Sequence, residues 1–524
     1  MFNSQKINKS PIDIEKSLLN KSIWLRLAQK IKLKNLQRYG KIILKLIHRK
    51  SKRKLRYWIK LFFILSPIQF YRLFHTSMGK ELILQLKNLT QYVDQADEIL
   101  EMQLPKQNKI KFFGKFSSYI QLNLYWITQT LERFKQLNDA TEKVVAIVKE
   151  LAQTEIKNNS YTNFDELPDL RKSGNYSFIK ETFFLEDHKR DLSFAEARCD
   201  RKFQVVIYYP QSYPNFKTPL IVISHGLGAS PADFKEYAQY LASHGYTVAI
   251  PQHPGSDANQ IENMLAGTEK EIFQLQEFLN RPLDITYLLD ELERGNPKQF
   301  KNKLNLEEVG VIGHSFGAYT TLALAGAEIN FDKLEKACSS IFEPINLSLL
   351  LQCRALHLPR KIYNFRDKRI KAILPIDCVG SEIFGANGIS QIKIPLLMIA
   401  GTEDRTAPAI LEQIRIFPWL KTTNSYLALM KGKAHISTFS TIETRLKVIL
   451  TQLIPNKYES DITIFCNYAY AISLAFFEVY LQDNQNALTY LQASYAQYLT
   501  QKPFDFYLIN SLSAKTLKFK VNIL

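Results

Sequence analysis

The pattern of hydrophobic and polar residues changes at about residue 175. After that point, short apolar runs of β-type residues alternate with longer stretches of helical spacing. Seven runs predict strands, at 203–209, 220–224, 247–251, 309–312, 372–375, 395–400 and 426–430. Helices are predicted between most of them, at 232–244, 269–294, 315–324 and 438–453. Buried strands that alternate with helices indicate a mostly parallel sheet covered on both faces, with its functional residues at the carboxyl ends of the strands.

The pattern before residue 175 is helical where it is regular. Apolar residues recur every three or four positions in 82–100 and 120–151, and a polar stretch with Pro and Gly follows at 158–174. The sequence therefore predicts four parts: a basic extension over 1–65, a helical region over 66–157, an α/β domain over 175–457, and a helical extension over 458–524 that packs on this domain.

The net charge of +18 is concentrated near the amino terminus, since residues 1–60 hold 18 Lys or Arg and only two acids. Within 22–50, apolar residues recur at helical spacing among the basic ones. This pattern is typical either of an amphipathic helix on an anionic membrane surface or of a solvated extension, and we favour the extension. The rest of the chain is nearly neutral, so nucleic-acid binding is not expected.

No signal peptide or membrane-spanning helix is predicted. The apolar run 61–65 is far shorter than the roughly 20 residues of a membrane span, and 469–481 is predicted to be a buried helix. We therefore expect a cytoplasmic protein, with peripheral membrane contact through 22–50 as the alternative. Five cysteines without CxxC spacing indicate neither a disulfide framework nor a zinc site, and we expect Cys338 and Cys353 to be reduced although they could pair across a loop.

The strongest chemical signal is the sequence GHSFG at 313–317. It follows the predicted strand 309–312 directly and precedes a helical run, which is the arrangement of a nucleophile elbow. Such a turn forces its serine, here Ser315, into a strained backbone conformation, and glycines flank it because larger side chains would collide with the strand and helix. The new helix also directs N–H groups at the site where negative charge develops. Ser315 is therefore the predicted nucleophile.

A serine nucleophile needs a base, and the base needs an acid that orients it. In proteins with this elbow the chain order is serine, acid, histidine. Only His357 and His435 follow Ser315, and His435 comes just after the last predicted strand, where a loop would carry the base. Asp404 and Asp377 each follow a predicted strand, and either could reach the histidine. We expect the triad acid to be Asp404, with Asp377 as the alternative.

The loop after strand 220–224 reads HGLG, and its glycines would let the backbone approach a substrate closely. We expect the N–H groups of Leu227 and Phe316 to form an oxyanion hole. His225 and Gly226 are expected to border the substrate pocket.

His253 ends the strand 247–251 and either lines this pocket or holds the loop, and we favour the second role. No Walker loop, GxGxxG, HExxH or EF-hand spacing is present, so neither a cofactor nor a metal is expected.

These motifs resemble the platelet-activating-factor acetylhydrolase and dienelactone-hydrolase-like branch of the α/β-hydrolases. The likeness rests on SHGLGAS, PQHPGSD, RPLDITYLLDEL, GHSFGAYT, and GTEDRTAP followed by KAHIS. The chain is also similar to a group of cyanobacterial α/β-hydrolases with an extra N-terminal helical region, through LFHTSMGKELILQL and NLSLLLQCRAL. The resemblance spans about residues 70–510 and implies an α/β-hydrolase fold.

The resemblance also implies a serine hydrolase that cleaves carboxylic esters, such as short or oxidised acyl chains of phospholipids, through an acyl-enzyme. Leu227 and Phe316 occupy the positions that supply oxyanion N–H groups in the acetylhydrolases. Dienelactone hydrolases use cysteine where this chain has Ser315. The animal acetylhydrolases take their acid from the position of Asp377, whereas the cyanobacterial group uses that of Asp404. A thioesterase or peptidase with the same triad, and a non-catalytic membrane-associated scaffold, are the alternatives.

Overall fold

The computed structural model of this chain describes residues 69, 72–73, 75–81, 111–158, 161, 163–190, 200–213, 217–339, 346–435 and 462–522. The chain divides into two units, residues 1–66 and 67–524, and every described residue belongs to the second. The predicted membrane-contact segment 22–50 lies outside the described residues, as do the helices predicted at 82–100 and 438–453.

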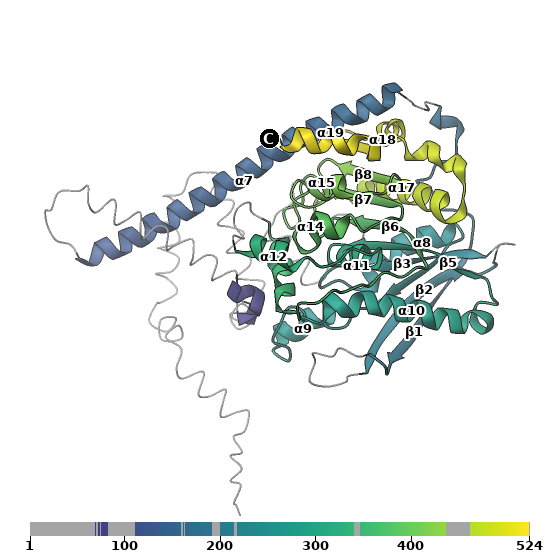
Figure 1. Ribbon diagram of the computed structural model, residues 1–524, viewed down its shortest axis with the longest axis horizontal. Coiled ribbons are helices and arrows are strands. Elements are labelled where there is room, and N and C mark those ends of the chain that lie inside the picture. Colours follow the sequence, from purple (N-terminus) through teal and green to yellow (C-terminus); the bar gives the residue numbers. More distant parts are fainter. Residues whose placement is uncertain are drawn as a thin grey trace, which may run out of the picture. The chain divides into compact units, whose positions relative to one another are not determined.

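The second unit is built on one nine-stranded sheet in the order β1-β2-β4-β3-β5-β6-β7-β8-β9 (Figure 1). The strands from β4 to β8 in this order run parallel, and β1, β2 and β9 add antiparallel pairs at the two edges. Their bounds are β1 (Phe178–Asp187), β2 (Arg201–Pro210), β3 (Thr218–Ser224), β4 (Thr247–Pro251), β5 (Leu304–His314), β6 (Ile370–Ile376), β7 (Leu396–Gly401), β8 (Ser425–Met430) and β9 (Phe506–Asn510). This mostly parallel sheet confirms the predicted fold class.

All seven predicted strands are present, whereas β1 and β9 were not predicted. β9 corrects the expectation that 458–524 is purely helical, because this segment adds an antiparallel strand to β8. A five-residue run such as FYLIN has too few positions to show a clear period, so its pairing with β8 decides its conformation. The C-terminal segment is thus part of the central sheet.

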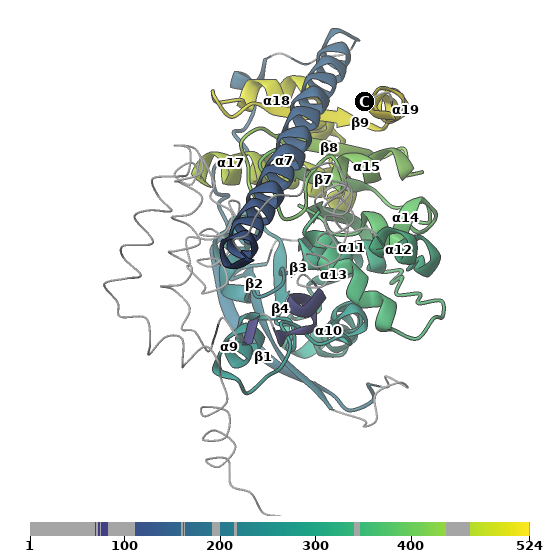
Figure 2. The same cartoon turned by 90° about the vertical axis from the view of Figure 1, so that its left-hand side faces the viewer.

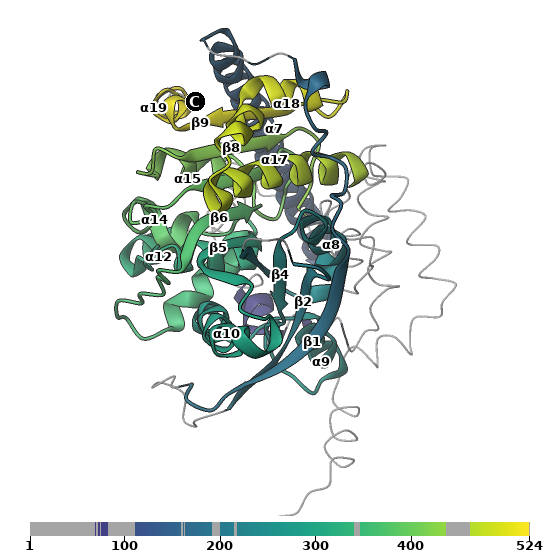
Figure 3. The same ribbon diagram turned by 90° about the vertical axis from the view of Figure 1, so that its right-hand side faces the viewer.

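Helices cover both faces of the sheet (Figure 3). On one face lie α8 (Lys235–Ser243) and α17 (Ile462–Gln482), and on the other lie α10 (Glu277–Gln299), α11 (Phe316–Leu324), α12 (Phe331–Cys338) and α14 (Ser381–Ile389). Strand β5 contributes to both cores, since Val311 belongs to the α10–α11 side and Ile312 to the α8–α17 side. This alternation is the period of two that a strand imposes on its side chains.

Helix α17 is long and apolar enough to cross a membrane by length and composition. Two thirds of its most apolar stretch is buried inside the fold, and the helix packs there against β5, β6 and β7. The prediction of a buried helix over 469–481 is therefore confirmed.

In the described part of the region before the sheet, the longest helix is α7 (Lys111–Asn158). Its C-terminal part lies beside β9, α18 (Ala493–Leu499) and α19 (Ser511–Asn522), as Figure 2 shows. Glu155 of α7 accepts hydrogen bonds from the Asn510 amide groups and from the Ser513 hydroxyl. Helix α7 and the C-terminal elements thus lie together at the β9 edge of the sheet.

Cys338 and Cys353 form a disulfide, so the prediction that both are reduced is wrong. Helix α12 ends at Cys338, and a 3-10 helix begins at Cys353, which brings the two Cα atoms to 5.8 Å. This separation lies in the normal range for a disulfide. Sequence spacing could not reveal the pair, because it does not show that the chain folds back between the two helices. Cys378 and Cys466 are buried thiols that take part in no disulfide.

Candidate active site

Ser315 lies in the turn between β5 and α11, with a backbone φ of 55° and ψ of −115°. A residue with a side chain rarely adopts a positive φ, and such strain is stored where the surroundings enforce it. A Cβ on Gly313 would lie 2.1 Å from the Gly317 carbonyl oxygen, and one on Gly317 would lie 1.9 Å from that of Ser224. Only glycine fits at both positions, which gives the physical reason for the spacing of the motif.

The structure brings Ser315, His435 and Asp404 together at the carboxyl ends of β5, β8 and β7. The Ser315 Oγ lies 2.9 Å from His435 Nε2, and His435 Nδ1 lies 2.6 Å from Asp404 Oδ2. The three residues are only 8%, 7% and 4% exposed, so the hydrogen bonds are largely shielded from water. This connectivity is that of a nucleophile, a base and an orienting acid.

The Asp404 carboxylate is held from both sides. Its second oxygen, Oδ1, accepts the backbone N–H groups of Thr406 and Ala407 at 2.9 and 2.8 Å. A carboxylate can only accept, so the proton on His435 lies at Nδ1, and Nε2 is left to accept from the serine hydroxyl. Burial by itself lowers the pKa of His435, but the Asp404 carboxylate outweighs it, and the pKa is raised above its ordinary value. The imidazole is therefore a stronger base than a free histidine.

Asp377, the alternative acid, is engaged elsewhere. It forms a fully buried ion pair with Lys433, and His314 Nε2 lies 3.7 Å from the same carboxylate oxygen. Burial raises the pKa of Asp377, but the charge of Lys433 outweighs this, and the net shift is downward. His314 also donates to the backbone carbonyl of His435 at 2.8 Å. This cluster holds the loop that carries His435, while Asp404 holds its ring.

Lys433 was missed by the sequence reasoning. The available signal was its place two residues before His435, in KGKAHIS, together with an aspartate at the end of a neighbouring strand. Nothing in the sequence shows that the two are paired, because they are 56 residues apart.

The HGLG loop passes close to Ser315. A Cβ on Gly226 would lie 3.4 Å from the Ser315 Cβ and 3.0 Å from His314 Nδ1, so glycine allows this approach. Phe316 is the first residue of α11, and its N–H has no acceptor within the helix. In the described part of the chain, no hydrogen bond occupies the N–H of Leu227 either. Both predicted oxyanion donors are thus available beside the serine.

The prediction that His225 borders a substrate pocket is wrong, because its side chain is fully buried and hydrogen-bonded at both ring nitrogens. The side chain of His253 is also fully buried and bonded at both ring nitrogens, so it does not line a pocket either. His225 Nε2 accepts the His253 N–H at 3.1 Å, and its Nδ1 donates to the Gly226 carbonyl at 2.8 Å. His253 Nε2 lies 3.0 Å from the Ser224 hydroxyl, and its Nδ1 lies 2.9 Å from Asp284. These contacts fit the role that the sequence favoured for His253, that of holding the loop.

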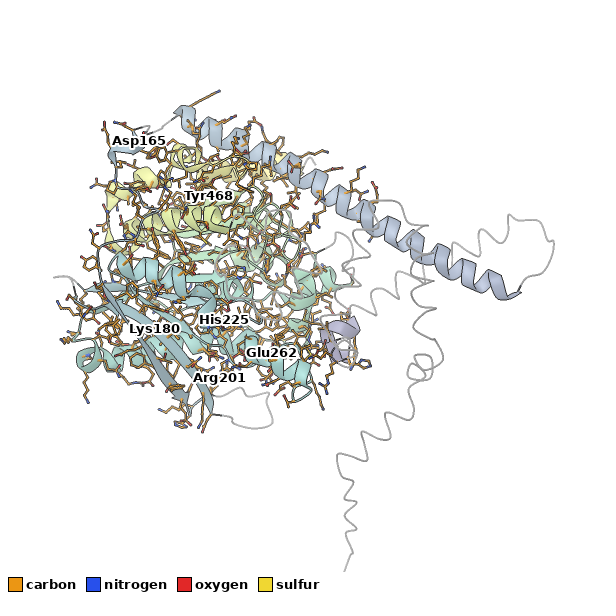
Figure 4. All side chains as sticks on the ribbon, turned by 180° about the vertical axis from the view of Figure 1, so that it is seen from behind. Asp165, Lys180, Arg201, His225, Glu262 and Tyr468 are labelled. Carbon is orange, nitrogen blue, oxygen red and sulfur yellow. A yellow bond between two sulfur atoms is a disulfide. The ribbon has the colours of Figure 1, made fainter. Side chains whose placement is uncertain are left out.

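Behind the loop lies a buried charge network that sequence reasoning missed. It joins three arginines to three acids, namely Arg190, Arg201, Arg281, Asp187, Glu277 and Asp284. Arg201 and His225, labelled in Figure 4, belong to the segments that meet here, β2 and the loop after β3. The available signal was RPLDITYLLDEL, in which charged residues interrupt an otherwise apolar helix.

Two groups among the described residues bring histidine and carboxylate atoms within 4.8 Å, the spacing that a metal ion would need. The first consists of His314, Asp377 and His435, whose atoms already bond Lys433 and Ser315. The second consists of Glu186, His188 and Asp200, which are exposed or half-exposed. In the first group one buried donor atom, Asp377 Oδ1, has no hydrogen-bond partner, and a single such atom does not indicate a metal centre.

Comparison with known proteins relates part of the chain to an established family. Residues 219–341, which include the HGLG loop and GHSFG, match the family described as "alpha/beta hydrolase fold". The platelet-activating factor acetylhydrolase of Canis lupus familiaris is 26% identical over 148 residues, which cover 22% of this chain and 33% of that protein. The platelet-activating factor acetylhydrolase of Bos taurus is 24% identical over 148 residues, which again cover 22% of this chain and 33% of that protein. The match spans about a third of the length of these curated relatives.

Proposed function

Because this chain belongs to the α/β-hydrolase superfamily, we propose that it is a serine hydrolase that cleaves carboxylic esters. The observation that carries the proposal is the hydrogen-bonded chain of Ser315, His435 and Asp404 at the turn between β5 and α11. The fold by itself would not support an activity, since one fold hosts many functions. The strained serine, the raised pKa of His435 and the two available N–H donors support acyl transfer together.

The proposed reaction has two steps. Ser315 Oγ attacks the ester carbonyl while His435 takes its proton, and the N–H groups of Leu227 and Phe316 stabilise the oxyanion. His435 then donates the proton to the leaving alkoxide, and an acyl-enzyme remains. Water, activated by the same histidine, hydrolyses the acyl-enzyme and releases the acid. Asp404 keeps the imidazole in the required tautomer throughout.

We propose phospholipid esters with short or oxidised acyl chains as the substrate class. Support comes from the matched relatives, which are named platelet-activating factor acetylhydrolases. A thioesterase and a peptidase would use the same groups, so a panel of short acyl esters, short-chain phospholipids, acyl thioesters and peptides would separate them. The proposal predicts the largest kcat/KM for the esters, and a preference for peptides or thioesters would contradict it.

A fluorophosphonate probe tests the reaction itself, because it modifies an activated serine. We expect the folded wild-type chain to be labelled and Ser315→Ala to be unlabelled. Labelling that survives in Ser315→Ala would assign the reactive residue elsewhere. An unlabelled, folded wild type would instead favour the non-catalytic scaffold.

A further inference from the structure

Arg281 of α10 is a fully buried arginine to which the proposed mechanism gives no role. Its Nη1 donates to the His225 carbonyl at 2.6 Å, its Nη2 lies 3.4 Å from the Gly226 carbonyl, and its Nε donates to the Ser256 hydroxyl at 2.9 Å. Burial lowers the pKa of Arg281 to about 10, so the side chain is still charged at neutral pH. Burying a charge costs free energy of folding. A buried arginine that contacts two successive carbonyls of the HGLG loop therefore calls for an explanation.

The reason lies in the geometry of the peptide bond. In a trans peptide the carbonyl and the following N–H point in opposite directions. The Gly226 carbonyl shares a peptide plane with the N–H of Leu227, the expected oxyanion donor. Arg281 approaches this carbonyl, and His225 Nδ1 donates to it at 2.8 Å. With the carbonyl held toward α10, the Leu227 N–H must point away from α10.

The same guanidinium also contacts the side chain of Phe316, the residue whose N–H is the other expected oxyanion donor. The Cζ of Arg281 lies 4.4 Å from the centre of the Phe316 ring, a cation–π distance. Phe273 and Phe278 pack edge-on against this ring, with centroids at 5.5 and 5.1 Å. Arg281 therefore contacts the carbonyl of the peptide group that carries one expected oxyanion donor, and the side chain of the residue that carries the other.

Neighbouring groups hold the partners of Arg281 in place. Glu277, one turn earlier on α10, accepts the Ser256 hydroxyl at 2.9 Å. The Ser256 carbonyl in turn accepts the N–H of Gly228 at 2.8 Å, which anchors the far end of the loop. Asp284, one turn later, orients His253, whose N–H donates to His225. Each contact of Arg281 with the loop is thus backed by a second contact.

We infer that Arg281 is a positioning residue for the oxyanion hole: it sets the orientation of the 226–227 peptide and holds Phe316. The inference rests on the proposed function, since an oxyanion hole has a purpose only in acyl transfer. Arg281 touches no reacting atom. Lysine cannot replace it, because a single ammonium group cannot reach two carbonyls and a hydroxyl at once in this planar arrangement.

The test is the kinetics of Arg281→Lys with a short-chain ester. We expect kcat to fall roughly ten- to a hundredfold with little change in KM, because the oxyanion contacts form only in the transition state. The loss is smaller than the roughly 10²–10³ that follows deletion of a donor, since here the donor is misdirected and not removed. Affinity for a trifluoromethyl ketone, which forms a tetrahedral adduct on Ser315, should fall by a similar factor.

Arg190→Lys is the matched control. Arg190 bonds Asp187, Asn280 and Asp284 of the same buried network, and among the described residues it bonds no atom of the loop 225–228. We expect a comparable loss of Tm in both variants but a drop in kcat and inhibitor affinity only in Arg281→Lys. If Arg281→Lys does not fold, Arg281→Gln is the substitute variant. Its side-chain amide keeps one donor for a loop carbonyl, and the expected losses are the same.

Two results would overturn the inference while the proposed function stands. One is an unchanged kcat in Arg281→Lys, and the other is an equal loss of kcat in Arg190→Lys. A wild-type chain that neither hydrolyses esters nor reacts with fluorophosphonate would overturn both proposals together.

Discussion

Among the residues that the structure describes, two hydrogen-bonded chains of serine, histidine and aspartate have the same connectivity. We call them the elbow triad and the buried triad. The elbow triad consists of Ser315, His435 and Asp404, and the buried triad consists of Ser224, His253 and Asp284. The serine-to-histidine distances are 2.9 and 3.0 Å, and the histidine-to-aspartate distances are 2.6 and 2.9 Å. Residue types and distances alone therefore do not distinguish the two.

The backbone and the burial do distinguish them. Ser224 is the last residue of β3, and its carbonyl oxygen packs against Gly317. Ser315 stands in a turn at positive φ, at the start of a helix. The buried triad is fully inaccessible, whereas each residue of the elbow triad keeps some exposure. Of the two serines, only Ser315 is partly exposed and stands directly before the first N–H groups of a helix.

The charges around the two histidines also differ. Burial, and then the charge of Arg281, lower the pKa of His253 to about 4. Its aspartate, Asp284, is shared with Arg190 and Arg201, so less of its charge acts on the histidine. His435 faces a carboxylate held mainly by backbone N–H groups, and its pKa is raised. The comparison teaches that a hydrogen-bonded chain of serine, histidine and aspartate is suited to catalysis only where the histidine can also accept a proton.

The largest expected difference concerns the two serines. Ser315→Ala should lower kcat/KM by about 10⁴-fold or more with little change in Tm, because it removes the proposed nucleophile. Ser224→Ala should leave kcat/KM within about tenfold, but it should destabilise the fold by about 1–3 kcal/mol because a buried nitrogen of His253 loses its donor. Ester kinetics and thermal unfolding of both variants measure this. A dead Ser224→Ala enzyme with normal stability would break the comparison.

The next effect concerns the aspartate of the buried triad. Asp284→Asn leaves Arg190 and Arg201 with an uncompensated buried charge, which should lower the free energy of unfolding by about 3–5 kcal/mol. Urea unfolding followed by circular dichroism measures it. Asp404→Asn is the matched variant and should unfold close to the wild-type midpoint. Similar midpoints for Asp284→Asn and wild type would show that the buried network contributes little stability.

Replacing Asp404 should lower the catalytic rate, whereas replacing Asp284 should lower the free energy of unfolding. Asp404→Asn should lower kcat at least about a hundredfold, because asparagine favours the wrong tautomer of His435. Asp377→Asn should retain more activity and lose more stability, since it leaves the buried Lys433 unpaired. A near-normal rate in Asp404→Asn, with a large loss in Asp377→Asn, would transfer the role of the acid to Asp377.

The pH dependence of activity should report His435. Because the base must be neutral, kcat/KM should fall as the pH drops through the folded-state pKa of His435, which lies above its ordinary value of 6.5. In Asp404→Asn the carboxylate that raises this pKa is gone, so the midpoint of the residual activity should move to lower pH. A pH–rate profile of both proteins checks this, and an unchanged midpoint would contradict it.

The last prediction concerns the pH dependence of stability that His253 contributes, which leaves activity at neutral pH untouched. Its folded pKa of about 4 lies below the ordinary 6.5, so between these values the unfolded chain binds a proton that the folded chain does not. The contribution is present above about pH 6.5 and is lost toward pH 4, at up to about 1.4 kcal/mol per pH unit. His435 has the opposite sign, since its contribution is lost as the pH rises through its raised pKa. His253→Gln should flatten the acidic slope in urea unfolding series, and an unchanged slope would assign it to other groups.

Much of the fold and the candidate site could be predicted because the signals are local. Seven strands of β-type residues, the helix that follows GHSFG, and the order of Ser315, Asp404 and His435 can be read from neighbouring residues. The need for glycine at 313 has a local cause as well, since a Cβ there would collide with the carbonyl of Gly317, four residues on. The need for glycine at 317 is not local, because a Cβ there would collide with the carbonyl of Ser224 in the neighbouring strand.

Other features depend on contacts between segments far apart in sequence. The choice between two strand-end aspartates follows from the position of Lys433, and β9 is a strand because β8 pairs with it. The disulfide of Cys338 depends in the same way on how two short helices meet.

Residue order and local sterics therefore determined which serine stands in the elbow and which histidine and acids follow it. Only the tertiary structure decided which aspartate meets His435, and that Ser224 and His253 form a second, inaccessible chain. The physical reason is that a pKa, a desolvated ion pair and a peptide orientation depend on all the groups that surround an atom. Those groups, such as Arg281 beside the HGLG loop, come together only when the sheet is assembled.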